Sequence, residues 1–260
     1  MKSTSFININ GDIKQSKIQI IIYVLINLIQ NIYFNLLRRK FIYLEFKKPS
    51  VLSKFNDKHS ISRKLCSLFW KNINWKILIK HMGLLNIHEI GSGDGTYFKE
   101  DISIKSKFYK KYKGCDINFH KKWKFNKNKK VSFSKFNGVD FYKTFNKGTN
   151  LFISQSCLEH VRYDLKFFND LKSYSKKSKK KIVFIHCVPS PFCLFTYLTH
   201  GFRQYNIGNV NKISSIFENE NMYVCKLGNV NLNIQHLFKT TFPLIFKNKN
   251  LMKNQNKNYY

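Results

Sequence analysis

The chain has 260 residues, with 46 lysines and arginines against 14 aspartates and glutamates, and its formal net charge is +32. A chain of this length can bury one sizeable core, which favours a single α/β domain with an extra segment over several domains. Nearly all of the positive charge is lysine, whereas specific phosphate and base recognition favours arginine. Together with the excess of Asn, Ile, Phe and Tyr, this indicates an AT-biased genome and predicts only non-specific attraction to nucleic acid or anionic membranes.

The six cysteines are scattered along the chain and none forms a C-x-x-C pair. This excludes a zinc ribbon and a disulfide framework, and it fits a reducing cytoplasm. The sequence shows no other cluster of metal ligands, so no metal is expected.

The N-terminal part of the chain predicts a helical extension over residues 1–80. Residues 1–16 are polar and lack a cleavable signal. Residues 17–37 are rich in Ile and Leu and precede a basic flank, but five side-chain amides interrupt them. Because those amides are costly in lipid, a helix packed on the domain or lying on a membrane surface is favoured over a membrane-spanning helix. Residues 41–84 show helical spacing of apolar side chains.

Residues 85–98, LNIHEIGSGDGTYF, are the most informative stretch. They predict a buried strand that ends at Glu89, a glycine turn, and a helix start over about 96–108. Gly91, Gly93 and Gly95 remove three Cβ atoms from one turn, so the backbone can approach a ligand closely. The spacing is neither the dinucleotide fingerprint nor a phosphate loop, which favours a nucleoside-like ligand without a pyrophosphate.

A second strand is predicted to end at Asp116, in the sequence Gly-Cys-Asp-Ile-Asn. An acid about 20 residues beyond a glycine turn suits a ribose-hydroxyl acceptor. Residues 131–134 predict a third strand that leads to Asn137 and Asp140. The lysine-rich stretch 119–130 between them is expected to be solvated.

Residues 150–161 predict a fourth strand that runs into Ser154 and Gln155, followed by a helix beginning near Glu159 and His160. His160 could be a base, a substrate contact or a capping residue. The stretch 181–191 predicts a fifth, fully buried strand with His186 at its rim. A histidine at that edge is the best candidate for a general base or substrate contact, although a structural role is equally consistent.

The remaining residues predict a lid over 192–208, a helix over 211–219, a strand over 222–227, a last antiparallel strand over 240–246 and a basic disordered tail over 247–260. Strands that alternate with helices predict an α/β fold. We therefore expect a doubly wound, mostly parallel seven-stranded sheet with helices on both faces, over residues 81–246.

The pieces Glu-Ile-Gly-Ser-Gly-Asp-Gly and Leu-Glu-His-Val, in this order along the chain, resemble motifs I and IV of the class I S-adenosylmethionine (SAM)-dependent methyltransferases. The resemblance implies SAM as cofactor. It implies that Glu89 contacts the methionine part of SAM, that Asp116 binds the ribose, and that Asp140, or else Asn137, contacts the adenine. It also implies that Ser154 and Gln155 lie beside the sulfonium.

The implied activity is methyl transfer to a small-molecule, lipid or sugar acceptor, in the cytoplasm or at the membrane surface. An RNA methyltransferase and an inactive SAM-fold binding protein are the alternatives. The oligomeric state does not follow from the sequence.

Overall fold

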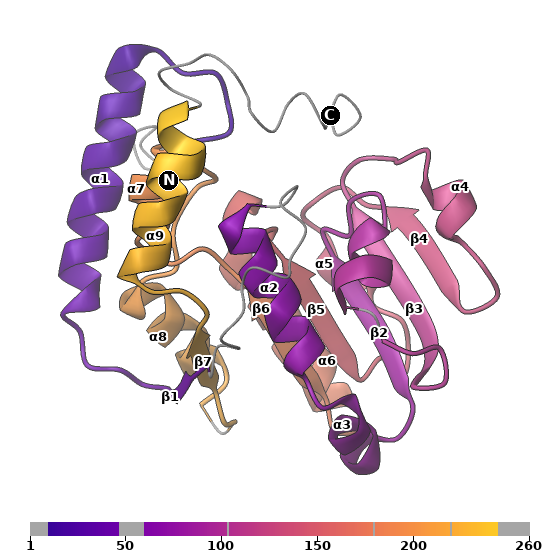
Figure 1. Ribbon diagram of the computed structural model, residues 1–260. Coiled ribbons are helices and arrows are strands. Elements are labelled where there is room, and N and C mark those ends of the chain that lie inside the picture. The colour runs from indigo at the N-terminus through magenta and orange to yellow at the C-terminus, as the bar shows by residue number, and fades with distance from the viewer. Residues whose placement is uncertain (1–9, 47–59, 103, 179, 219, 244–260) are drawn as a thin grey trace.

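The computed structural model describes residues 10–46, 60–102, 104–178, 180–218 and 220–243. Five parallel strands form the main sheet in the order β4-β3-β2-β5-β6 (Figure 1). The chain builds one half outward from β2 and then crosses to the other side of β2 to begin β5. The switch point of the sheet therefore lies between β2 and β5, where open α/β sheets bind ligands. The strands are β2 (Leu85–Ile90), β3 (Tyr109–Asp116), β4 (Val131–Lys135), β5 (Leu151–Gln155) and β6 (Val183–Cys187).

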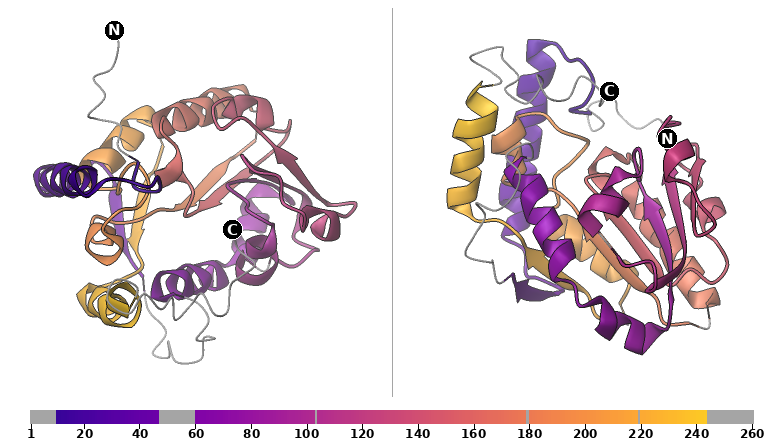
Figure 2. Two further views of the ribbon diagram at one scale, coloured as in Figure 1. Left: turned by 90° about the horizontal axis from the view of Figure 1, so that it is seen from above. Right: turned by 45° about the vertical axis from the view of Figure 1, so that its right-hand side comes forward.

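Helices cover both faces of this sheet, as Figures 1 and 2 show. One face packs on α2 (Ile61–Asn72) and α3 (Trp75–Met82), through a core that includes Trp70, Ile87 and Leu151. The other face packs on α6 (Asp164–Lys177) and α8 (Ile207–Ile216), through a core that includes Phe152 and Phe167. The central strands β2 and β5 are buried on both faces, which explains their near-continuous apolar runs. The predicted doubly wound, mostly parallel α/β fold is confirmed.

The seven strands are distributed differently from the prediction. The strand predicted near 222–227 is β7 (Tyr223–Lys226), but β7 pairs in parallel with β1 (Ile42–Glu45) in a separate two-stranded sheet. Sequence periodicity identifies a strand without identifying its neighbour, and this neighbour comes from the N-terminal segment.

The antiparallel strand predicted over 240–246 is wrong where the structure describes it. Residues 230–243 are helical, through α9 (Val230–His236) and the π-helix η5 (Leu237–Thr241). Phe238 and Phe242 are four residues apart, and their ring centroids lie 5.3 Å apart, a spacing that suits a helix. The helix predicted over 96–108 is also reduced to a short π-helix, η3 (Phe98–Ile102). The predicted tail 247–260 lies outside the described residues.

Helix α1 (Lys17–Asn35) packs along the C-terminal part of the chain, beside α8 (Figure 1). Ser16 begins it with a capping box, in which its hydroxyl accepts from the Gln19 N–H and the Gln19 side chain accepts from the Ser16 N–H. Its buried residues are Tyr23, Asn27 and Asn31, so the inward face of the helix is largely polar. By length and composition alone, α1 could cross a membrane.

Candidate functional site

The glycine turn follows β2 directly and is the centre of the candidate site. Gly91, Gly93 and Gly95 all have positive φ angles, of 71°, 52° and 82°, which is why the turn requires glycine. A Cβ on Gly91 would lie 2.3 Å from the Cys157 sulfur, and one on Gly95 would lie 2.5 Å from the Phe133 ring. A Cβ on Gly93 would meet no atom within 4 Å. The backbone at Gly93 therefore faces open space, where a ligand can approach it.

Asp116, at the end of β3, lies against this turn. Its Oδ2 accepts a hydrogen bond from the Gly93 N–H at 2.9 Å, and its Oδ1 accepts from the Asn118 N–H at 2.9 Å. Each carboxylate oxygen has a second lone pair for a further donor. The structure thus brings together Gly91, Gly93, Gly95 and Asp116 at the carboxyl ends of two neighbouring strands.

The short helix α4 (Trp123–Asn126) packs against the outside of the turn. It lies within the lysine-rich stretch 119–130 that we expected to be solvated. The Trp123 indole N–H donates to the Gly93 carbonyl at 2.7 Å, and its ring stacks on Phe133 with centroids 5.5 Å apart. The Asn126 amide donates to the Asp94 carbonyl at 2.8 Å. A tryptophan within a lysine-rich stretch is the signal that could have revealed this contact, because indole N–H groups find partners when buried.

Asp94 links the glycine turn to Lys122, the residue before α4. Its carboxylate accepts from the Lys122 ammonium at 2.8 Å and from the Thr96 N–H at 2.9 Å. Partial burial opposes ionisation, but these hydrogen bonds outweigh it and lower the pKa of Asp94. The turn therefore carries a fixed negative charge on the side of Lys122.

Glu89 lies beneath the turn with a side chain 2% exposed. Its Oε2 accepts from the Tyr112 hydroxyl at 2.5 Å, so β2 and β3 are linked by their side chains as well as by the backbone. Burial and the neighbouring Glu89 charge raise the pKa of Tyr112, which keeps this hydroxyl a donor.

Ser154 and Gln155, the predicted neighbours of the sulfonium, turn to opposite faces of β5. The Ser154 hydroxyl and His186 Nδ1 are 2.8 Å apart on the α6 side. The side-chain Oε1 of Gln155 accepts from the Trp70 indole N–H at 2.6 Å on the α2 side. The next residue, Ser156, has a positive φ of 48°, which is unusual for a residue other than glycine and typical of functional sites.

His186 faces α6 and packs against the rings of Phe167 and Phe168, at centroid distances of 5.5 and 5.6 Å. Burial among these rings lowers the pKa of His186 to about 3, so the imidazole is neutral at pH 7. Its role as a base or substrate contact stays a prediction.

Asp140 and Asn137 form a local turn after β4. Asp140 Oδ2 accepts from the Asn137 amide at 2.9 Å and from Lys143 at 3.2 Å, and these hydrogen bonds lower the pKa of Asp140. The two candidates for the adenine contact are therefore bonded to each other. His160 lies in a different cluster, with its Nδ1 2.5 Å from the Asp12 carboxylate.

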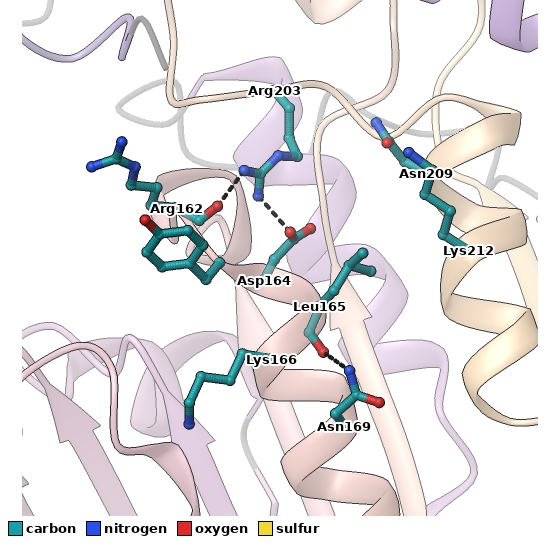
Figure 3. Close-up of a pocket in the computed structure, with 9 residues that line it drawn as sticks. Arg162, Asp164, Leu165, Lys166, Asn169, Arg203, Asn209 and Lys212 are labelled. Atoms are coloured by element: carbon teal, nitrogen blue, oxygen red, sulfur yellow. Dashed lines mark hydrogen bonds and ion pairs between the residues drawn. The ribbon is translucent and has the colours of Figure 1, made fainter. Parts of the chain in front are cut away.

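A surface pocket of about 550 Å³ lies between α6 and the start of α8 (Figure 3). Arg203 lines it and is held by the Asp164 carboxylate at 2.7 Å and by the carbonyl of Arg162 at 2.6 Å. These contacts tie the segment before α8 to the start of α6. No residue of the glycine turn lines this pocket, and its Arg203 guanidinium is already paired with Asp164. We therefore place the candidate site at the turn.

No protein-family model and no curated protein matches the chain. Among solved structures, the plantazolicin methyltransferase BamL, in complex with a triazolic desmethylPZN analog and SAH, matches with a TM-score of 0.37 at 13% identity. The match covers 73% of this chain and 62% of BamL. The plantazolicin methyltransferase BpumL in complex with SAH matches with a TM-score of 0.36 at 14% identity, over 73% of this chain and 65% of BpumL. The chain thus spans less than two thirds of either enzyme.

Proposed function

We propose that this protein is a SAM-dependent methyltransferase. The observation that carries the proposal is the juxtaposition of Gly93, whose missing Cβ leaves open space, with the Asp116 carboxylate 2.9 Å from its N–H. A bare backbone beside a carboxylate fits a nucleoside, because the turn can pass under the ligand while the acid accepts from vicinal ribose hydroxyls. The switch point between β2 and β5 is where this fold binds such ligands.

In this proposal each residue at the turn has one task. Asp116 grips the ribose, and its bonds to two backbone N–H groups hold the carboxylate in place. Glu89 carries a buried negative charge below the turn and contacts the methionine part directly or through water. Asp140, with Asn137 bonded to it, stands at the adenine end after β4.

SAM supplies an electrophilic methyl group when bound, so the protein's own contribution is mainly orientation. Gln155 fixes Trp70 and therefore the end of α2 beside the strand. His186 acts through Ser154, whose hydroxyl it holds, because its ring is enclosed by Phe167 and Phe168. We propose His186 as a positioning residue, and the acceptor as a small molecule, lipid or sugar.

We further propose that the protein works at an anionic membrane surface. Six apolar side chains, five in α1 and one at its C-cap, are 52–82% exposed and recur every three or four residues, which lines them along one face of the helix. They are Ile18, Ile21, Leu25, Ile29, Ile32 and Leu36. The inward face bears Asn27 and Asn31, so the more apolar face of α1 points away from the protein.

An anionic bilayer fits this face better than a second copy of the chain does. Arg38, Arg39 and Lys40 follow the stripe directly, and the net charge of +32 attracts anionic lipid while it repels another copy. The buried contacts also favour a helix lying on the membrane over one that spans it. The Asn31 amide donates to Gln204 at 3.2 Å and accepts from Asn206 at 3.1 Å. A helix that spanned the membrane would lose both hydrogen bonds.

The decisive experiment for the enzyme is calorimetry with SAM and with its demethylated product, S-adenosylhomocysteine, on the purified chain. We expect saturable heat with both ligands, and an absence of heat with either one would reject the proposal. Transfer of a labelled methyl group from SAM into fractionated cell extract then identifies the acceptor. Counting label in the lipid, carbohydrate, small-molecule and RNA fractions separates the proposed acceptors from an RNA substrate.

A further inference from the structure

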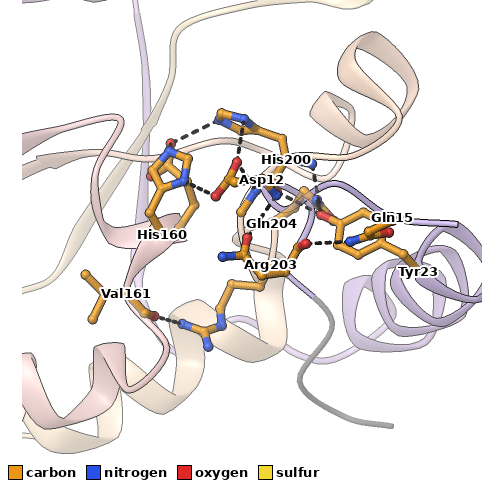
Figure 4. A network of polar contacts seen from close by, with 11 residues as sticks. Asp12, Gln15, Tyr23, His160, Val161, His200, Arg203 and Gln204 are labelled. Atoms are coloured by element: carbon orange, nitrogen blue, oxygen red, sulfur yellow. Dashed lines mark hydrogen bonds and ion pairs between the residues drawn. The ribbon is translucent and has the colours of Figure 1, made fainter. Parts of the chain in front are cut away.

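Four ionisable side chains converge at the carboxyl end of β5, outside the contacts that hold the glycine turn. Figure 4 labels three of them, Asp12, His160 and His200. Asp12 precedes α1, Glu159 and His160 belong to the 3₁₀-helix η4 (Leu158–His160), and His200 follows α7 (Cys193–Tyr197). The two imidazole rings are perpendicular, at 88°, with centroids 4.8 Å apart. Residues from three distant parts of the chain therefore meet at one point.

Each histidine ring lies between the two carboxylates. Towards Asp12, the Nδ1 atoms of His160 and His200 lie 2.5 and 3.7 Å from its oxygens. Towards Glu159, the Nε2 atoms of the same rings lie 3.8 and 3.5 Å from Oε1. In each ring, Nδ1 thus faces the Asp12 carboxylate, which can orient the ring, and Nε2 faces the Glu159 carboxylate.

The backbone holds these groups in place. The Gly201 N–H donates to Asp12 at 3.0 Å, the Gly11 N–H donates to the Gly201 carbonyl at 2.7 Å, and the Phe202 N–H donates to the Glu159 carbonyl at 2.8 Å. Gly201 has a φ of 63°, and a Cβ there would lie 2.6 Å from the Glu159 carbonyl oxygen. Only glycine fits this approach, so the geometry is built into the chain.

Glu159 supplies the observation that points to a ligand. Its side chain is 1% exposed, and its Oε2 is buried without a hydrogen-bond partner among the described residues. A buried carboxylate is costly unless a positive group compensates it. In the part of the chain that the structure describes, the basic side chains within 4 Å of it are the two histidine rings. Both rings are about one-third exposed, so an ion has access from solvent.

We propose that Glu159, His160 and His200 bind a divalent transition-metal ion of the zinc class. Imidazole nitrogen and carboxylate oxygen are the ligands that such ions prefer. Two ligand atoms of one tetrahedral zinc, each about 2.0 Å from it, are separated by roughly 3.4 Å. The separations of 3.5 and 3.8 Å from Glu159 Oε1 to the two Nε2 atoms are close to this value.

Asp12 takes the outer position in this site. It hydrogen-bonds His160 Nδ1 at 2.5 Å and lies 3.7 Å from His200 Nδ1. A carboxylate behind the ring is how proteins fix the orientation of metal-binding imidazoles. Asp12 is also near enough to be a ligand itself, since ligand atoms of Asp12, His160 and His200 lie within 4.8 Å of one another. In either arrangement the ion joins the segment before α1, η4 and the segment after α7. The proposal does not depend on the methyltransferase function.

The test uses the full chain, freed of any affinity tag and of metal by chelation. Titration with Co²⁺ should produce visible d–d absorption that saturates at one ion per chain, and Zn²⁺ should displace it. Bound Zn²⁺ should raise Tm by several degrees because it binds only the folded state. Mg²⁺ should bind far more weakly, since imidazole is a poor ligand for it.

Variants decide whether these residues hold the ion. We expect His160→Ala and His200→Ala each to weaken Co²⁺ binding at least 10-fold, and Asp12→Ala to weaken it to a smaller extent. His81→Ala is the matched control, because His81 is exposed on α3, and its binding should equal the wild type. The absence of a spectral change in the wild type, or wild-type Co²⁺ affinity in the folded His160→Ala and His200→Ala variants, would overturn the proposal. If His200→Ala does not fold, wild-type Co²⁺ affinity in the folded Asp12→Ala and His160→Ala variants would likewise overturn the proposal.

Discussion

The Gly93 N–H donates to the Asp116 carboxylate at 2.9 Å, although the two residues are separated by a helical turn and a whole strand. The bond exists because β2 and β3 run parallel and side by side, so their carboxyl ends share one edge of the sheet. It joins the backbone that can approach a ligand to the acid that can grip it.

Replacing Asp116 by Asn should weaken SAM binding about 10- to 100-fold. The amide oxygen can still accept from one of the Gly93 and Asn118 N–H groups, which are bound by the two oxygens of Asp116 in the wild type. The charge-assisted bonds to the ribose are lost, at about 1.5–3 kcal/mol. Calorimetry measures the dissociation constant. Glu218→Gln removes an exposed acid elsewhere and should leave that constant unchanged. Wild-type affinity in a folded Asp116→Asn protein would contradict the ribose role.

Alanine at two of the glycines should separate ligand binding from stability. Gly91→Ala places a methyl group 2.3 Å from the Cys157 sulfur at a positive φ, and should lower the free energy of unfolding by about 2–4 kcal/mol. Gly93→Ala meets open space in the protein and should cost about 1–2 kcal/mol for its backbone conformation alone. It should nevertheless abolish most SAM binding, because the methyl group occupies the ligand's side of the turn. Urea denaturation and calorimetry on both variants test this, and a Gly93→Ala protein that binds SAM normally would refute it.

His186, partly buried against Phe167 and Phe168, should make the protein sensitive to acid. Burial lowers its folded-state pKa to about 3, while the unfolded chain titrates near 6.5. As the pH falls below 6.5, the unfolded state takes up a proton that the folded state does not, so stability is lost progressively towards pH 3. From this group alone, the free energy of unfolding should fall by about 3 kcal/mol between pH 7 and pH 4.

Urea denaturation of wild type and His186→Asn over that pH range measures the difference. The variant should be less stable at pH 7 but should lose less stability on acidification. His88, whose pKa burial also lowers to about 3, remains in both proteins and cancels in the comparison. Parallel pH profiles for the two proteins would show that His186 is not buried as a neutral ring.

The exposed stripe of α1 should bind anionic vesicles. We expect the wild-type chain to co-sediment with phosphatidylglycerol vesicles at physiological salt and much less with phosphatidylcholine. The double variant Ile21→Ser/Leu25→Ser should bind at least about 10-fold more weakly, since each side chain loses apolar burial in the interface. Ile77→Ser on α3 removes a comparably exposed isoleucine and serves as the control. Equal sedimentation of all three proteins would show that charge, and not the apolar stripe, causes the binding to vesicles.

Local patterns in the sequence were sufficient for the architecture and for the glycine turn. Apolar runs and glycine spacing are properties of neighbouring residues, so β2, β3, β5 and the position of Asp116 could be predicted from them. The same patterns placed a strand over 240–246, where Phe238 and Phe242 instead support a helix. They also detected β7 without its partner β1, because the pairing joins residues 181 positions apart, such as Ile42 and Tyr223.

Only the tertiary structure decided which side chains meet. No local pattern indicates the histidine cluster, because Asp12, His160 and His200 are far apart in the chain and follow no ligand spacing. Likewise, Trp123 lay in a stretch read as solvated, yet it holds the Gly93 carbonyl. Composition, periodicity and turn chemistry act over a few residues and determine the elements. The contacts that shape a site act through space, and they exist only after the sheet has brought distant segments to one edge.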